Sequence, residues 1–194
     1  FNLPNVNLVD LNENPLKRVT HNSINAGDSE YKTDLIVLAT GFDAMTGALN
    51  KINISGIDGS LKEKWENGPK SYLGLMSHNF PNLFTITGPG SPSVLTNMMT
   101  SIEQHVEWIS TCLKYMQSNR FTCIEPHLKA ENTWMEHSNS LAGDSLRITC
   151  NSWYLGANIP GKKRVFMPYI GGVPTYRKKC EEEVLSDYSG FIFN

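Results

Sequence analysis

The chain has 194 residues, of which 40% are hydrophobic, 10% aromatic and 19% charged, and its formal net charge at pH 7 is -2. A domain of this length buries about 70% of the surface that its unfolded chain exposes, and the composition excludes a disordered chain, a collagen and a coiled coil. The charge gives no support for a nucleic-acid partner, and no run of about 18 apolar residues that could span a membrane occurs.

The chain begins at Phe1 without the basic and apolar regions of a signal peptide, so we expect a piece of a longer protein that continues on its N-terminal side. The four cysteines form no C-x-x-C pair and are too few for a disulfide scaffold, so we expect reduced thiols and a cytoplasmic location. The five histidines include no H-E-x-x-H pattern, so no metal site is expected.

Strands are the first elements that the sequence predicts. Residues 5–10 alternate weakly, as an edge strand does, and the polar stretch 11–32 indicates a hairpin or meander. Residues 34–40 (DLIVLAT) form an apolar run without alternation that ends at Gly41. Such a run is typical of a strand buried on both faces of a parallel or mixed sheet in an α/β layer. A second short strand is expected over 82–88.

The clearest helix follows the glycine-rich sequence GPGSPS, with Ser93 as its expected N-cap. Apolar residues recur along it in steps of three and four and predict one buried stripe: Leu95, Met98, Met99, Ile102, Val106, Ile109, Leu113 and Met116.

Four further elements are expected towards the C-terminus. A second helix over 126–141 would turn Leu128, Met135 and Leu141 inward and stop at Gly143. Residues 151–161 are loop-like, 164–170 suit a short strand, and 175–185 suit a terminal helix.

The glycine loop before the long helix is the first candidate site. A helix N-terminus presents free N–H groups and a partial positive charge, which suit an anion or an electron-rich carbonyl. The loop does not match the dinucleotide fingerprint G-x-G-x-x-G, because Ser93 stands where the third glycine belongs. A structural turn and a ligand-contacting loop are both open.

Trp153, in the loop sequence NSWYLGANIPGK, is the second candidate. Its indole N–H needs a partner when buried, so this side chain is either pinned to the protein or held ready for a ligand. Trp65, Trp108 and Trp134 are expected to be packing residues.

Two basic clusters differ in their surroundings. Lys162-Lys163-Arg164 follows the glycine and proline loop, where a basic group either meets a phosphate or is solvated. Arg177-Lys178-Lys179 precedes three glutamates, which indicates a solvated helix face with ion pairs.

No catalytic constellation is evident. Glu103 and Glu107 lie one helical turn apart, with His105 on a different face, and a solvated face explains the two glutamates. No G-x-S-x-G is present, so hydrolase chemistry has no support.

Three blocks in order resemble the C-terminal part of Baeyer–Villiger monooxygenases: DLIVLATGFDAMTG, SYLGLMSHNFPNLFTITGPGSPSVLTNMMTSIEQHVEWI, and NSWYLGANIPGKKRVFMPYIGG with the following TYR. The form GPGSPS-x-L-x-NM is most similar to the phenylacetone monooxygenase branch. The resemblance extends over residues 5–192.

The resemblance implies an α/β fold, as the C-terminal fragment of a flavoprotein with two Rossmann-like domains for FAD and NADP. Residues 1–43 would be the tail of the NADP-binding domain with a return strand, and 44–194 the C-terminal part of the FAD-binding domain with a mobile NADP-contacting loop. The implied reaction uses NADPH and dioxygen to insert oxygen beside a ketone carbonyl, giving an ester or lactone. The flavin performs the difficult step, and the protein supplies placement and water exclusion.

The resemblance also assigns residues. Met98, with Asn97, corresponds to a position at the flavin ring, and Trp153 to the loop tryptophan that contacts NADP. Thr40 and Gly41 belong to the ATGF block near the cofactor. The residues that correspond to the substrate pocket are Ser93, Val94 and Leu95.

Several family features are absent from these residues. Neither G-x-G-x-x-G nor F-x-G-x-x-x-H-x-x-x-W occurs, so we expect the isolated chain to be inactive and, with half a core, prone to aggregate. Two alternatives remain: an N- or S-oxygenating flavin monooxygenase, or a non-catalytic binding domain derived from one.

Overall fold

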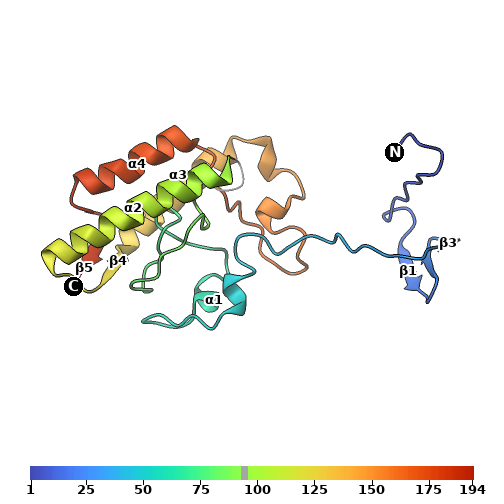
Figure 1. Ribbon diagram of the computed structural model, residues 1–194, viewed down its shortest axis with the longest axis horizontal. Helices are drawn as coiled ribbons and strands as arrows, with labels where there is room; N and C mark the ends of the chain where they lie inside the picture. Colours follow the sequence, from blue (N-terminus) through green and yellow to red (C-terminus); the bar gives the residue numbers. More distant parts are fainter. Residues whose placement is uncertain (93–95) are drawn as a thin grey trace. The chain divides into compact units, whose positions relative to one another are not determined.

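The computed structural model describes residues 1–92 and 96–194 (Figure 1). The chain divides into two compact units, Phe1–Thr40 and Gly41–Asn194, which are described one at a time. Among the described residues, no helix has the length and apolar character needed to cross a membrane.

The first unit is built on a small antiparallel meander, which confirms the prediction for 11–32. Strands β1 (Leu16–Val19), β2 (Ser23–Ala26) and β3 (Ser29–Lys32) lie in the order β1-β2-β3. Gly27 allows the tight turn between β2 and β3, because its φ of 57° lies in the left-handed region that favours glycine.

Two predicted strands of this unit do not form. Residues 5–10 are irregular, and 34–40 are extended but unpaired, with Val37 78% and Leu38 81% exposed. A strand requires hydrogen bonds from a neighbour, and no strand in the described part of the chain pairs with 34–40. The prediction of a strand buried on both faces is therefore wrong for this chain.

The described part of the second unit contains four α-helices and a two-stranded sheet. The helices are α1 (Leu61–Lys64), α2 (Met98–Asn119), α3 (Leu128–Gly143) and α4 (Val173–Leu185). Short 3-10 turns occur at η1 (Leu49–Lys51), η2 (Leu146–Ile148) and η3 (Trp153–Leu155). Strands β4 (Ile124–Pro126) and β5 (Phe191–Phe193) pair antiparallel.

The sequence therefore locates the three long helices but overstates the strands. Residues 82–88 and 164–170 are not strands in the structure. They make single backbone bonds instead, such as Thr85 N to Leu75 O at 2.7 Å and Tyr169 N to Ser91 O at 2.9 Å. The fold class is mixed α/β, but none of the strand pairs in the described residues is parallel.

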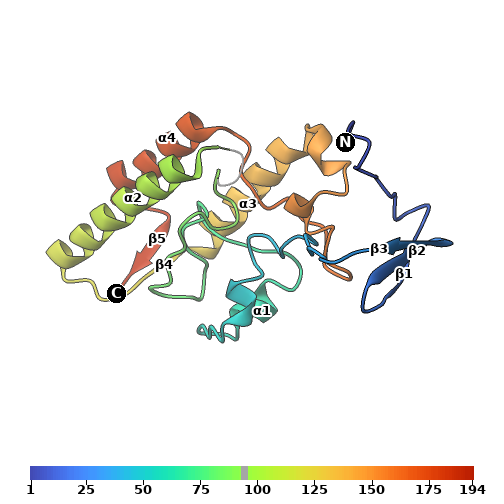
Figure 2. The ribbon, with the colours of Figure 1, turned by 45° about the vertical axis from the view of Figure 1, so that its right-hand side comes forward.

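The core of the second unit lies among α2, α3, α4 and the β4–β5 pair (Figure 2). Trp108 and Trp134 are buried in it, and the Trp108 indole donates to the Cys180 carbonyl of α4 at 3.0 Å. Trp65 is buried in a smaller cluster with Leu61 and Phe80. These three tryptophans are packing residues, as predicted.

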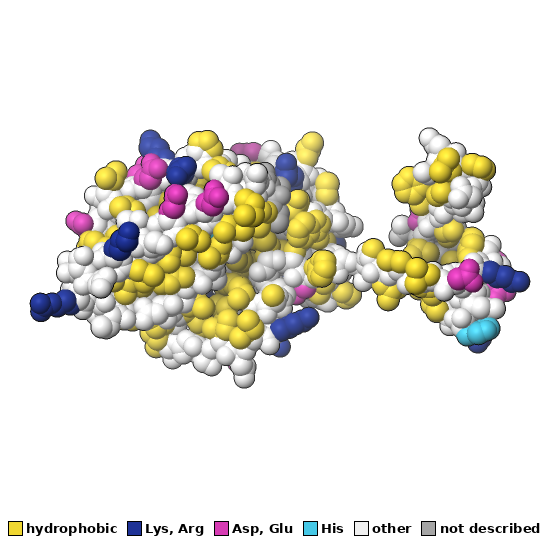
Figure 3. Space-filling model, viewed as in Figure 1, with side chains coloured by type: hydrophobic (Ala, Val, Ile, Leu, Met, Phe, Trp, Pro, Cys, Tyr) yellow, Lys and Arg dark blue, Asp and Glu magenta, His cyan; other side chains and the backbone are white. Residues whose placement is uncertain are grey.

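Helix α2 buries a different face from the predicted stripe. Of the stripe, Met116 is buried, whereas Met99 is 63% and Leu113 48% exposed. The buried face carries Ser101, Gln104, His105, Trp108, Cys112 and Met116. Of its polar members, Ser101 and His105 have hydrogen-bond partners inside, which offsets the cost of burying them, whereas the buried Gln104 Oε1 has no partner within the described residues. A band of hydrophobic side chains consequently runs along α2 on the surface (Figure 3).

Helix α3 buries a charged residue that periodicity did not predict. Leu128 is 51% exposed because it opens the helix, while Met135 is buried as expected. Glu131 is fully buried, pairs with Lys64 Nζ at 2.9 Å and accepts from His78 N at 2.9 Å. This carboxylate joins α3 to α1 and to the loop at His78.

Replacing Glu131 by Gln leaves the Lys64 ammonium without its charged partner, and breaking a partly buried pair in this way costs about 3 kcal/mol. We expect the free energy of unfolding, measured by urea titration, to fall by about that amount. Glu136→Gln, on the exposed face of the same helix, is the matched control and should change it little. Equal effects of the two variants would contradict this account.

Candidate functional site

The glycine loop before α2 is buried and fixed from several sides. Gly90 N donates to Met167 O at 2.7 Å, and Gly90 O accepts from the Trp134 indole at 3.0 Å. The Ser71 hydroxyl bonds the Pro89 carbonyl. Gly90 has a φ of 86°, and a Cβ there would meet Ser71 Oγ at 3.1 Å. These bonds give residues 88–92 the properties of a structural turn.

A buried histidine holds the residue just before this loop. Thr87 N donates to His105 Nδ1 at 2.8 Å, so the ring proton lies on Nε2. Nε2 donates to Tyr176 Oη at 2.8 Å, and Tyr176 Oη donates to Leu73 O at 2.6 Å. Burial lowers the pKa of His105 to about 4, so the ring is neutral at pH 7. The network joins α2, α4 and two loops.

The start of α2 contains two of the predicted site residues. Asn97 is the N-cap, and its side chain accepts from Met99 N at 3.0 Å. Met98 lines a cavity of about 380 Å³ together with Met45, Leu49, Phe84, Thr85, Ile86, Thr87 and Gly88. The predicted pocket residues Ser93, Val94 and Leu95 lie outside the described residues. The prediction of Ser93 as the N-cap of the long helix is wrong, because α2 begins at Met98 and Asn97 caps it.

Trp153 opens η3 and is 42% exposed. The backbone behind it is fixed, since Val165 N donates to Leu155 O at 3.2 Å and Met167 N to Tyr154 O at 3.1 Å. Its ring lies against the Tyr154 ring, with the centroids 4.6 Å apart. Of the two alternatives for Trp153, this exposure favours a side chain held ready for a ligand over one pinned in the core.

One short segment, residues 41–49, contacts the loop of Trp153 and also lines the cavity at Met98. Asn158, in the loop of Trp153, donates to Phe42 O at 2.9 Å, and a Cβ at Gly41 would lie 3.4 Å from its Nδ2. Lys162 of the same loop pairs with Asp43 and donates to Thr46 Oγ1 at 2.7 Å. At its other end the segment lines the Met98 cavity. Thr40, the exposed last residue of the first unit, keeps its cofactor role as a prediction only.

Asp43, Thr46 and Lys162 are the residues that the sequence analysis missed. The sequence marks Lys162 only as part of a basic cluster and predicts a phosphate or solvent as its partner. In the structure its partner is the carboxylate of Asp43. A partner 119 positions away leaves no local signal in the sequence. The second basic cluster does form the predicted exposed pairs, including Arg177 with Glu181 at 3.6 Å.

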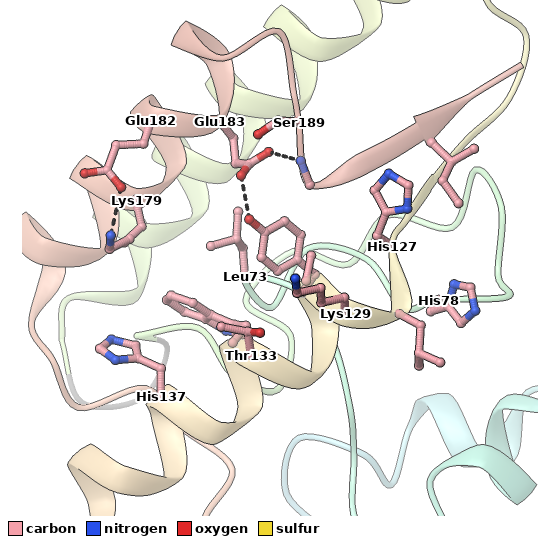
Figure 4. A pocket seen from close by; sticks show the side chains of 16 residues that line it. Leu73, His78, His127, Lys129, Thr133, His137, Lys179, Glu182, Glu183 and Ser189 are labelled. Carbon is pink, nitrogen blue, oxygen red and sulfur yellow. Dashed lines mark hydrogen bonds and ion pairs between the residues drawn. The ribbon is translucent and has the colours of Figure 1, made fainter.

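A separate cavity of about 1020 Å³ lies between α3, α4 and β5 (Figure 4). None of the predicted site residues that the structure describes lines it. Its acidic groups are already engaged, because Glu183 accepts from Tyr72 Oη at 2.6 Å and Glu182 pairs with Lys179 at 2.8 Å. Within the described residues, no three His, Cys, Asp or Glu side chains gather as a metal site would require.

Comparisons with curated proteins cover the whole chain, although no family model matches it. The acetone monooxygenase (methyl acetate-forming) of Gordonia sp. (strain TY-5) is 40% identical over 197 residues, which cover 100% of this chain and 37% of that protein. The phenazine N-monooxygenase of Lysobacter antibioticus is 39% identical over 196 residues, covering 100% of this chain and 36% of that protein.

Solved structures agree with this match. The closed crystal structure of cyclohexanone monooxygenase gives a TM-score of 0.95 at 40% identity, covering 100% of this chain and 36% of that one. The structure of OTEMO in complex with FAD and NADP gives 0.92 at 38% identity, with the same coverage. The chain thus spans little more than a third of the length of these relatives.

Over a span of about 36% of their length, the chain matches Baeyer–Villiger monooxygenases by sequence and by fold, and it belongs to that family. The resemblance found in the sequence is confirmed.

The neutral His105 predicts a pH dependence of stability. Its folded pKa of about 4 lies below the usual 6.5, so between these values the unfolded chain binds a proton that the folded chain does not. The free energy of unfolding should therefore fall by about 3 kcal/mol as the pH drops from about 6.5 to about 4.

Urea titrations at several pH values measure this effect. In His105→Gln the amide accepts from Thr87 and donates to Tyr176 but does not titrate, so its profile should be flatter in that window. A profile as steep as that of the unmodified chain would contradict the assignment.

Proposed function

We propose that this chain is the part of a Baeyer–Villiger monooxygenase that completes the flavin site and supplies a loop to the nicotinamide cofactor. The whole protein would use NADPH and dioxygen to insert oxygen beside a ketone carbonyl, giving an ester or lactone. In this proposal residues 1–43 belong to the NADP-binding domain and 44–194 to the FAD-binding domain. The observation that carries it is the contact of one segment, 41–49, with both the loop of Trp153 and the Met98 cavity.

The cavity at Met98 suits the edge of a flavin ring. Met98, Leu49 and Ile86 give it apolar walls, and Thr85 and Thr87 add polar atoms near the buried loop. A planar ring with apolar faces and a polar edge fits such a lining. When bound, FAD supplies the redox chemistry and the activation of dioxygen.

The roles of this chain's residues follow from their positions. Met98 would pack on the ring, and Asn97 would keep the helix start in register through its cap. Trp153 would contact NADP through its indole N–H and its exposed face. Ser93, Val94 and Leu95 would shape the ketone pocket, as the family resemblance implies, and Gly41 and Thr40 would lie near the cofactor.

Two apolar surfaces support the proposal that more protein covers this segment. The outer face of α2 exposes Met99, Val106 and Leu113, and residues 35–38 of the first unit expose a run of aliphatic side chains. Contiguous apolar surface of this kind marks an interface. The remaining two thirds of a family member are the partner we infer for both.

N-oxygenation is the second candidate function, because a phenazine N-monooxygenase matches the whole chain about as well as the ketone oxygenases do. The protein that contains this chain should be incubated with NADPH, dioxygen and either cyclohexanone or phenazine, and the products identified by mass spectrometry. A lactone supports the proposal, whereas an N-oxide alone would replace it with the alternative.

The isolated chain should oxidise no NADPH with FAD and ketone present.

Trp153→Ala removes the indole donor without touching the core. If Trp153 contacts the cofactor, the KM of the full-length oxygenase for NADPH should rise about 10-fold, which corresponds to the loss of one good hydrogen bond. Tyr31→Ala, at a half-exposed ring in the first unit, serves as the control for loss of an aromatic side chain. An unchanged KM in Trp153→Ala would remove Trp153 from the proposed site.

A further inference from the structure

We propose that Lys162 is a positioning residue, which acts with Asp43 and Thr46 as a latch that holds the loop of Trp153 against residues 42–46. Its consequence for the cofactor rests on the proposed function, since it assumes that Trp153 contacts NADP. The latch itself is a property of this chain and can be measured without any cofactor.

The ammonium group of Lys162 has two partners on one short segment. It forms an ion pair with Asp43 and donates to Thr46 Oγ1 at 2.7 Å. Thr46 is 1% exposed, and the side chains of Lys162 and Asp43 are 19% and 32% exposed. A charge-assisted bond with this degree of shielding is stronger than an ion pair in open solvent.

The aliphatic part of Lys162 links the latch to Trp153. A Cβ at Gly156 would lie 2.9 Å from Lys162 Cδ, so the lysine stem crosses the turn at Gly156. Gly156 has a φ of 71°, and its backbone N donates to Trp153 O at 2.9 Å. The contacts therefore run without interruption from Asp43 through the lysine stem and Gly156 to the backbone of Trp153.

A second hydrogen bond attaches the loop of Trp153 to residues 42–46. Asn158 Nδ2 donates to Phe42 O at 2.9 Å, one residue before Asp43. Lys162 and Asn158 thus hold the two sides of the Ile159–Gly161 turn on the same segment. With both in place, less conformational freedom is lost when the loop closes on a ligand.

The competing role for Lys162 is direct binding of a cofactor phosphate. The two roles predict opposite effects of Asp43→Asn. If Lys162 acts as a latch, Asp43→Asn removes its ion pair, so the loop loosens and cofactor binding weakens. If Lys162 binds a cofactor phosphate, Asp43→Asn removes the carboxylate that competes with the phosphate, so cofactor binding strengthens.

The first test uses this chain alone, with Lys162→Met compared to Lys163→Met. Methionine keeps the stem on Gly156 and removes only the ammonium group. Lys163 is the matched control, because it is exposed and bonds only Asn67 Oδ1, at 3.3 Å. Hydrogen exchange of peptides covering 152–162 should become about 10-fold faster in Lys162→Met and stay unchanged in Lys163→Met. Equal exchange in the two variants would overturn the latch.

Tryptophan quenching by acrylamide gives a second measure of the loop. Trp153 is 42% exposed, while Trp65, Trp108 and Trp134 are at most 5% exposed, so quenching reports mainly on Trp153. Quenching should increase in Lys162→Met and in Asp43→Asn, and Lys162→Arg should restore much of the original value. No change in either loosened variant would count against the latch.

The second test uses the full-length oxygenase that contains the chain. The KM for NADPH should rise about 10-fold in Lys162→Met and in Asp43→Asn, with little change in kcat. A lower KM in Asp43→Asn would overturn the latch in favour of phosphate binding. Faster exchange with an unchanged KM would leave the latch in place and remove the proposed role of Trp153. If the full-length protein oxidises no ketone, the proposed function fails, and the exchange measurement still decides on the latch.

Discussion

The neutral imidazole of His105 is the contact on which the second unit depends. It accepts from Thr87 and donates to Tyr176, which in turn bonds Leu73, so one ring fixes two loops and two helices. Because Thr87 directly precedes the glycine loop, the same ring fixes the point at which that loop begins. Trp134 and Met167 then hold Gly90 inside the loop. The candidate flavin cavity at Met98 lies beside this anchored turn.

The helices were predictable because their signals are local. The starts of α3 and α4 lie two residues from the predicted positions, and the glycine loop and the meander are where composition indicated. The strand expected over 34–40 does not form, because DLIVLAT has the composition of a buried strand while its pairing depends on a neighbour that the described residues lack. The hydrophobic periodicity also predicts the wrong buried face for α2. His105 is polar, so the pattern assigns it to the surface, whereas its hydrogen-bond partners allow it to be buried.

The candidate site was predictable only in its most distinctive members. Trp153 and Met98 stand in recognisable motifs. In the structure Met98 shares a cavity with Met45 and Leu49, and Asn158, in the loop of Trp153, contacts Phe42. Asp43 and Lys162 are ordinary charged residues whose meaning comes from being brought together across most of the chain. Glu131 and Lys64 form a second pair of this kind in the core, where a buried carboxylate meets a lysine far away in the sequence. Long-range pairs of this kind are a product of the fold and leave no periodic trace.

The two faces of α2 have a consequence for protein engineering. Its inward face is held by hydrogen bonds and aromatic packing within the unit, while its outward face presents Met99, Val106 and Leu113 to solvent. The two faces share no residue, so they can be redesigned independently. Lysine or glutamate at the outward positions would give a more soluble stand-alone unit without disturbing its core, whereas leucine at His105 would restore a conventional amphipathic pattern and lose the network.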